Sequence, residues 1–383
     1  MGLTERAASE SRCDVNIKRQ SAFARTAPYA ELRLGFVPLT DCAPLVMAHE
    51  LGMFRRHGLR VRLRRELGWA SVRDKIVQGE LDAAHALAAM PLEASLGLGS
   101  PTCDCLTGLT LNLNGNAITL SSALWRHGVR DARTLRAEIA RSRRERTLTF
   151  GTVFAFSSHH YLLCKWLTAA GIQPGRDVRL VIMPPAQMVV NLQSGNLDGF
   201  CVGEPWSSLA VKARAGWCVA VSADLDPGHP EKVLMVRRDF AEKREAEHLA
   251  LLASLIEACK YCAAPQNQEE IIATLSRAEY VGVPIAVLRR GLRGPFDFGQ
   301  GDVRTVQDFC IFHGQDVNDP SPDKAAWALN LVRSSGSCPD SAALTMVLGQ
   351  RVYRSDIFHQ ARQLYEQHIG HDAPEPTNDL VLA

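Results

Sequence analysis

Hydrogen-bond donors of different kinds stand where predicted strands end in this sequence. They are an indole, a carboxamide, an imidazole, a backbone amide and an ammonium group. The residues are Trp69, Asn116, His159 or its neighbour His160, Gly203 and Lys232. Because one donor carries a full positive charge and the others are neutral, such a set suits a small anion with acceptors on every side. Predicted helix starts at Thr40 and at Ser157–Ser158 would add backbone N–H groups to the same site.

Each of these residues also has an ordinary structural interpretation. Trp69 could be a core aromatic at the head of a helix, and Asn116 could be a turn residue after Gly115. The histidines could cap or pack the helix that they begin, and Lys232 could be a solvated surface lysine. A site is favoured because all of them fall at predicted strand ends.

Three further residues are weaker candidates. Thr40 and Asp41 precede a predicted helix that begins near Ala43, and their side chains can cap it. Glu204 lies in the tip Gly-Glu-Pro-Trp that ends a short apolar strand. Its carboxylate could accept a hydrogen bond from a protonated ligand, or it could hold the strand tip in place.

A repeated unit indicates how these residues are positioned. The stretch IVQGELDAAHAL at 76–87 and the stretch LQSGNLDGFCV at 192–202 each predict a helix end, a turn and a buried strand. The residues that the two share are Gly79, Leu81 and Asp82 in the first and Gly195, Leu197 and Asp198 in the second. Strands alternate with helices around both, which predicts parallel sheets in an α/β chain. Ligands of such sheets bind outside the carboxyl ends of the strands.

The length favours two lobes. A single hydrophobic core usually stops growing at about 250–300 residues, and this chain has 383. We assign residues 31–117 and 233–383 to a first lobe and residues 118–232 to a second lobe inserted within it, with a ligand cleft between them. Residues 1–30 have charges throughout and predict a flexible leader.

Composition excludes some classes of function. An apolar content of 46%, a charged content of 22% and a net charge of +2 are ordinary for a globular protein and give no reason to expect direct nucleic-acid binding. Residues 126–146 hold eight arginines, which indicate a solvated helix face or a docking surface for an acidic partner.

Compartment and cofactors can also be predicted. The sequence shows neither a secretory apolar run near its start nor a stretch of about 18 apolar residues that could span a membrane. Eleven cysteines, an odd number, suit a reducing compartment. No cysteine or histidine spacing completes a zinc site. We therefore expect a cytoplasmic protein without metal, cofactor or membrane contact.

From about Leu32 to Phe240 the chain resembles the nitrate/bicarbonate-binding proteins of ABC importers. The segments that match include LRLGFVPLTDCAPLVMAHELGMF, LNLNGNAIT, PPAQMVVNLQSGNLDGFCVGEPW and HPEKV. The resemblance implies an α/β, two-lobed, periplasmic-binding-protein-like fold of type II with a hinge and a central cleft. It implies that an oxyanion is bound by Trp69, Asn116, His159, Gly203 and Lys232. Asn116 stands where the family has a glutamine, and this leaves the depth of the pocket open.

The importers of this family carry an export leader, and the start of this sequence does not look like one. The combination resembles cytoplasmic nitrate/nitrite sensors of the NasS type, which hold a NasT-like antiterminator until the anion arrives. That antiterminator is response-regulator-like and binds RNA. The resemblance implies a regulatory binding protein rather than an enzyme, with nitrate or nitrite and this antiterminator as partners.

Three alternatives stay open. One is the solute-binding component of a nitrate or bicarbonate importer. Another is an enzyme similar to the thiamine-pyrimidine synthases, although their cysteine-dense CCCFC-type motif has no match here. The third is a sulfonate or taurine binder, although such ligands usually call for arginines in the cleft.

Overall fold

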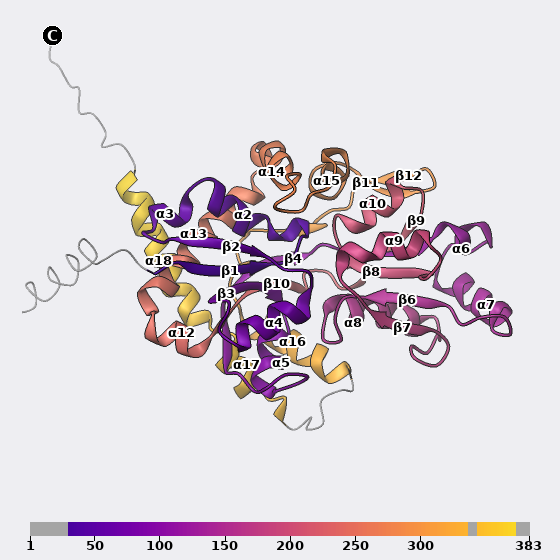
Figure 1. Ribbon diagram of the computed structural model, residues 1–383, viewed down its shortest axis with the longest axis horizontal. Helices are drawn as coiled ribbons and strands as arrows, with labels where there is room; N and C mark the ends of the chain where they lie inside the picture. The colour runs from indigo at the N-terminus through magenta and orange to yellow at the C-terminus, as the bar shows by residue number, and fades with distance from the viewer. Residues whose placement is uncertain (1–29, 336–342, 373–383) are drawn as a thin grey trace, which may run out of the picture.

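The computed structural model describes residues 30–335 and 343–372 (Figure 1). The leader predicted for residues 1–30 lies, apart from its last residue, outside this described part. The described residues form two large β-sheets that lie next to each other, with helices packed on both, and one two-stranded sheet (Figure 1). Within the described residues, no helix is long and apolar enough to cross a membrane.

The first sheet has six strands in the order β13-β4-β10-β3-β1-β2. Their bounds are β1 Leu32–Phe36, β2 Val61–Arg65, β3 Ala83–Leu87, β4 Cys105–Asn114, β10 Pro230–Arg237 and β13 Cys310–Ile311. β1 runs parallel to β2 and β3, whereas β10 pairs antiparallel with both β3 and β4. All residues of β3 are buried, as expected for a strand covered on both faces.

The second sheet has five strands in the order β7-β6-β8-β5-β9. Their bounds are β5 Asn116–Ser121, β6 Thr149–Thr152, β7 Arg179–Ile182, β8 Gly199–Gly203 and β9 Gly216–Val221. β6 runs parallel to β7 and β8, and β5 is antiparallel to β8 and β9. The parallel arrangement predicted from the sequence therefore holds for three strands in each sheet, and both sheets are mixed.

The predicted repeat is confirmed by matching contacts in the two sheets. Asp82 accepts a hydrogen bond from the backbone N–H of Arg33 at 2.8 Å, and Asp198 accepts one from that of Thr149, also at 2.8 Å. Gly79 and Gly195 both have positive φ, at +76° and +73°, in the turn before each aspartate. The aspartate thus ties the turn to the neighbouring parallel strand in each copy.

Helices cover both sheets. Those packed around the first sheet are α2 Ala43–Glu50, α3 Met53–Arg56, α4 Trp69–Val77, α5 Met90–Leu96, α12 Arg238–Lys243, α13 Glu245–Ala263, α14 Gln268–Leu275, α16 Pro322–Ser334, α17 Met346–Val352 and α18 Ser355–Asp372. Those around the second are α6 Ser122–Arg126, α7 Ala132–Ser142, α8 Ser158–Ala169, α9 Met188–Gln193, α10 Trp206–Lys212 and α11 Ser222–Leu225. The helix predicted to begin near Ala43 does so, and Gly52 at φ +69° separates it, as α2, from the short helix α3.

The C-terminal half also reaches the second sheet. α15 (Ile285–Leu292) leads into a hairpin of β11 (Phe296–Gly299) and β12 (Asp302–Arg304). Phe296 and Phe298 of this hairpin pack in one apolar cluster with Cys218 of β9. This hairpin falls within residues 233–383, which we assigned to the first lobe, and yet it packs on the second. The assigned bounds are also wrong at Asn116, which begins β5 of the second sheet, and at Lys232, which lies in β10 of the first.

Three of the segments that connect the two lobes meet at Asn114. The chain crosses from β4 to β5 at Gly115, whose φ is +105°. The carboxamide of Asn114 accepts a hydrogen bond from Gly228 N–H at 2.9 Å and donates one to the carbonyl oxygen of Asp308 at 2.9 Å. Residues 228 and 308 lie in two other connecting segments, so one side chain links three of the crossings between the lobes.

Candidate functional site

The five residues predicted to bind a ligand come from both sheets and meet in one buried cluster. Trp69 begins α4 and Lys232 lies in β10, while Asn116 begins β5, His159 lies in α8 and Gly203 ends β8. Trp69 is 1% exposed, and the side chains of Asn116, His159 and Lys232 are fully buried. The carboxyl ends of parallel strands in the two lobes thus face each other, as the sequence predicts.

Lys232 is held by two carboxylates. Its ammonium group lies 2.8 Å from Asp41 Oδ2 and 2.5 Å from Glu231 Oε1. Burial alone would lower the pKa of Lys232, but the two carboxylates outweigh burial and raise it. Burial would likewise raise the pKa of Asp41, and Lys232 with His85 lowers it instead. Lysine and aspartate are therefore a buried ion pair with both charges retained.

Glu231 is a site residue that sequence reasoning missed. It is fully buried, and burial, which alone would raise its pKa, is outweighed by Lys232, His159 and His229, so the pKa lies well below its ordinary value. Neighbours along a strand normally point to opposite faces. The pairing of β10 with β4 shifts register on both sides of Lys232, and such a bulge re-aims side chains, so Glu231 and Lys232 both reach the cluster.

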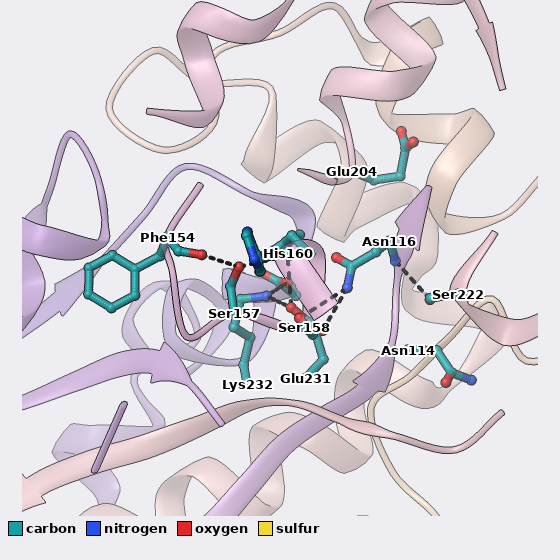
Figure 2. Close-up of polar contacts among 12 residues, drawn as sticks. Asn114, Asn116, Phe154, Ser157, Ser158, His160, Glu204, Ser222, Glu231 and Lys232 are labelled. Carbon is teal, nitrogen blue, oxygen red and sulfur yellow. Dashed lines mark hydrogen bonds and ion pairs between the residues drawn. The ribbon is translucent and has the colours of Figure 1, made fainter. Parts of the chain in front are cut away.

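Asn116 positions Glu231. Figure 2 shows its side chain pointing toward Glu231 and Ser158, and its amide nitrogen lies 2.6 Å from Glu231 Oε2 and 3.4 Å from Ser158 Oγ. A carboxamide NH₂ has two hydrogens, and these contacts use both. The expected role of Asn116 as a direct amide donor to the ligand is therefore not what this geometry provides. Its oxygen has no hydrogen-bond partner among the described residues.

Gly203 leaves room between the lobes. A Cβ atom at this position would lie 3.3 Å from Asn116 Oδ1 and 3.6 Å from Asp41 Oδ2. Gly203 pairs with Asn116 in the sheet, which places its backbone at the edge of the cluster. A side chain here would intrude between the carboxamide of one lobe and the carboxylate of the other.

Thr40 and Glu204 join the two lobes through the backbone. The N–H of Thr40 donates to the carbonyl oxygen of Glu204 at 2.8 Å. Thr40 and Asp41 lie in a short 3₁₀ helix, η2 (Thr40–Cys42), and no side chain caps the following α2. The predicted helix cap is therefore wrong, and the Asp41 carboxylate bonds His85 at 2.9 Å and Lys232 instead.

The Glu204 side chain faces away from the cluster. Both of its oxygens lie 3.3 Å from the backbone N–H of Ser208 in α10. Burial raises the pKa of Glu204 to about 7. Of its two predicted roles, holding the strand tip in place matches these contacts.

Trp69 and His159 supply donors that no protein group uses. The indole Nε1 and both ring nitrogens of His159 are buried without a hydrogen-bond partner in the described part of the chain. The Trp69 ring also lies 5.3 Å from the Lys232 ammonium. His159 Nε2 is 3.5 Å from Glu231 Oε1, whereas the neighbouring His160 contacts Cys164 Sγ outside the cluster. The choice left open between the two histidines therefore falls on His159.

The cluster offers donors to a small ligand. An ammonium group has three N–H bonds, and Asp41 and Glu231 use two of those on Lys232. The third, together with the Trp69 indole N–H and one His159 N–H, gives three donors from three elements, β10, α4 and α8. Leaving such donors buried and unpaired costs free energy, and an oxyanion satisfies them.

A groove lies beside this cluster. It has a volume of about 460 Å³ and is lined by residues on both sides of the lobe junction, including Trp69 and Gly68 of the first lobe and Phe154 and Pro184 of the second. Trp69 thus lines the groove and also lies beside Lys232. Within the described residues, no group of histidine, cysteine or acidic side chains is arranged to hold a metal ion.

Comparisons with known proteins identify the family of the chain. Residues 25–276 match the NMT1-like family. The chain belongs to this family. It is 32% identical over 359 residues to the nitrate/nitrite binding protein NrtA of Synechococcus elongatus, covering 90% of this chain and 80% of that protein. The crystal structure of the periplasmic nitrate-binding protein NrtA from Synechocystis superposes with a TM-score of 0.84 at 29% identity, covering 89% of this chain and 90% of that one.

Other relatives of the chain are longer proteins. It is 40% identical over 333 residues to the nitrate import ATP-binding protein NrtC of Synechocystis, which covers 86% of this chain and 49% of that protein. It is 37% identical over 336 residues to the bicarbonate transport ATP-binding protein CmpC of Synechococcus elongatus, again with 49% of that protein covered. The chain thus spans about half the length of these curated relatives. The α/β, two-lobed, periplasmic-binding-protein-like fold is confirmed.

Proposed function

We propose that this chain binds nitrate or nitrite between its two lobes and acts as a cytoplasmic sensor of these anions. The observation that carries the binding is the buried cluster, in which the third N–H of Lys232, the Trp69 indole and His159 converge without protein acceptors. Nitrate has three acceptor oxygens and no proton to donate, so it matches three donors. The likeness to nitrate-binding proteins supports the same ligand.

Bicarbonate is a second candidate ligand, because the described part of the site contains one hydrogen-bond acceptor that has no partner. Asn116 Oδ1 is buried, has no hydrogen-bond partner among the described residues and lies 3.3 Å from the Cβ position of Gly203. It could accept the O–H of bicarbonate, which nitrate lacks. Relatives named for bicarbonate transport are about as similar to the chain as those named for nitrate import.

The sensor role is supported by two features of the chain. Cysteines are numerous, and nine of them are free thiols in the described residues, most of them buried, as in proteins of reducing compartments. The ligand cluster also joins the lobes, through Lys232 of the first and His159 of the second, so occupancy can bias their relative position. In this scheme the form without anion holds a NasT-like, RNA-binding antiterminator, and closure around nitrate or nitrite releases it.

We expect anion and antiterminator to weaken each other's binding. Coupling free energies of about 1–3 kcal/mol correspond to a 5- to 150-fold change in affinity, and the change must be the same in both directions. The measurement is the nitrate dissociation constant of the purified chain with and without saturating antiterminator. Equal dissociation constants would show that the two binding events are not coupled. The chain would then only bind the anion, as expected for the solute-binding part of an importer.

Replacing Trp69 by phenylalanine should weaken anion binding while keeping the aromatic face beside Lys232. The lost indole N–H is a donor to a charged ligand and contributes about 1.5–3 kcal/mol, or roughly 10- to 150-fold in affinity. Trp166→Phe is the matched control, because Trp166 packs in the core of the second lobe. Calorimetric titration with nitrate measures both. If Trp69→Phe binds nitrate with unchanged affinity, the indole N–H does not donate to the ligand.

A further inference from the structure

The Glu231 carboxylate contacts several of the side chains that form the proposed ligand site. Lys232 and His159 approach its Oε1, at 2.5 and 3.5 Å. Asn116 and His229 approach its Oε2, at 2.6 and 3.1 Å. A carboxylate has about four lone-pair sites, three of these contacts are hydrogen bonds, and the remaining site is available to His159. Glu231 therefore positions the donors of both lobes at once.

The charge of this cluster follows from its hydrogen bonds. His229 Nδ1 lies 2.9 Å from the carbonyl oxygen of Asp226, and its Nε2 faces the Glu231 carboxylate. A carbonyl and an ionised carboxylate both only accept, so both contacts are hydrogen bonds only when each ring nitrogen of His229 carries a hydrogen. The ring stacks on Trp327 with ring centroids 5.4 Å apart. Asp41 and Glu231 are then balanced by Lys232 and His229.

A bound anion upsets this balance. The cluster is neutral without ligand, and a monovalent anion in the same buried space leaves one uncompensated negative charge, which a low dielectric makes costly. His159 is the group placed to compensate. It is fully buried, it lies beside Glu231, and without ligand burial lowers its pKa to about 4. A neutral ring has one N–H, whereas an imidazolium has two and can donate to the anion and to Glu231 together.

The other titratable groups that face this cluster are not placed to take up the proton. Asp41 from η2 and His85 from β3 bond each other at 2.9 Å. Cys201 from β8 and Cys310 from β13 are thiols whose pKa burial raises, so they stay neutral. Lys232 and His229 already hold their protons in the hydrogen bonds described above.

We infer that anion binding takes up one proton, which His159 holds between the ligand and Glu231. Glu231 is thus a positioning residue for the ligand and for the proton. This inference rests on the proposed function, since it concerns the same anion site. Because binding favours protonated His159, affinity for nitrate rises as pH falls, by about tenfold per pH unit between the pKa of the free site and that of the complex.

Calorimetric titration with nitrate in buffers of different ionisation enthalpy tests this. At several values between about pH 5 and pH 8, where histidines change charge, the slope of observed heat against buffer ionisation enthalpy gives the protons taken up. We expect close to one proton in the parent protein in the lower part of this range. His159→Gln should bind nitrate more weakly and take up none, and Glu231→Gln should take up markedly less than the parent.

His160→Gln is the control, because His160 lies on the same helix but contacts Cys164 rather than the cluster. It should take up as many protons as the parent. Nitrate binding without proton uptake at any pH overturns the inference and leaves the proposed ligand standing. Uptake that persists in His159→Gln overturns it too, because another group would hold the proton. If the parent binds neither nitrate nor nitrite, the proposed function and the inference fall together.

Discussion

Lys232→Ala should abolish measurable nitrate binding. The ammonium group supplies one of the three donors to the ligand, carries a full positive charge and is fully buried. A hydrogen bond from a charged group contributes about 1.5–3 kcal/mol. Its loss also leaves the anion beside Asp41 and Glu231 without their shared cation, so the fall in affinity should exceed about 100-fold. Calorimetric titration with nitrate checks this.

The same variant should also unfold more easily. Removing one partner of a buried ion pair typically costs about 3–5 kcal/mol, because the remaining charge stays buried and unpaired. Asp41 keeps His85 and Glu231 keeps His229, so the protein should remain folded at a lower denaturant midpoint. Lys243→Ala is the matched control, since the Lys243 side chain is 76% exposed. If Lys232→Ala bound nitrate as the parent does, the ligand could not lie beside this ammonium group.

Local sequence patterns predicted two α/β lobes and several of the residues at their junction, but neither the hairpin at 296–304 nor Glu231. Repeated turns around Asp82 and Asp198 indicated the duplicated unit, and the strand ends then placed Trp69, His159 and Lys232 at one cleft. Strand direction was not predictable in the same way. β4, β5 and β10 are paired by contacts between segments distant in sequence, so their local patterns do not reveal that β5 and β10 run antiparallel to their neighbours.

The roles of the charged residues were harder to predict. Alternation along a strand predicts that Glu231 and Lys232 point to opposite faces, and only the irregular pairing of β10 with β4 brings both into the site. Asp41 has the type and position of a helix cap, but a lysine far along the chain binds it instead. The direction in which Asn116 points likewise depends on Glu231.

Selectivity between anions follows from which groups in the cluster remain unused. Three donors are available, and Asn116 Oδ1 is the acceptor near Gly203 without a hydrogen-bond partner in the described residues. Nitrate uses the donors and leaves this oxygen unpaired, as it is without ligand. Sulfate brings a second negative charge that the cluster cannot balance with one proton on His159. We therefore expect nitrate and nitrite to bind and sulfate not to bind measurably.

The affinity for bicarbonate distinguishes a nitrate-binding protein from a bicarbonate-binding protein. Bicarbonate can bind well only if its hydroxyl reaches Asn116 Oδ1 while its other oxygens meet Lys232 and Trp69. If the hydroxyl instead meets His159 in its imidazolium form, donor faces donor and a hydrogen bond worth about 1.5–3 kcal/mol is lost. This corresponds to a preference for nitrate of at least roughly tenfold.

Calorimetric titration of the purified chain with nitrate, nitrite, bicarbonate and sulfate under one set of conditions tests the nitrate assignment most directly. The site described here should saturate with one nitrate or nitrite per chain, bind bicarbonate at least about tenfold more weakly, and give no heat with sulfate. Bicarbonate binding as tight as that of nitrate, or saturation by sulfate, would contradict the account.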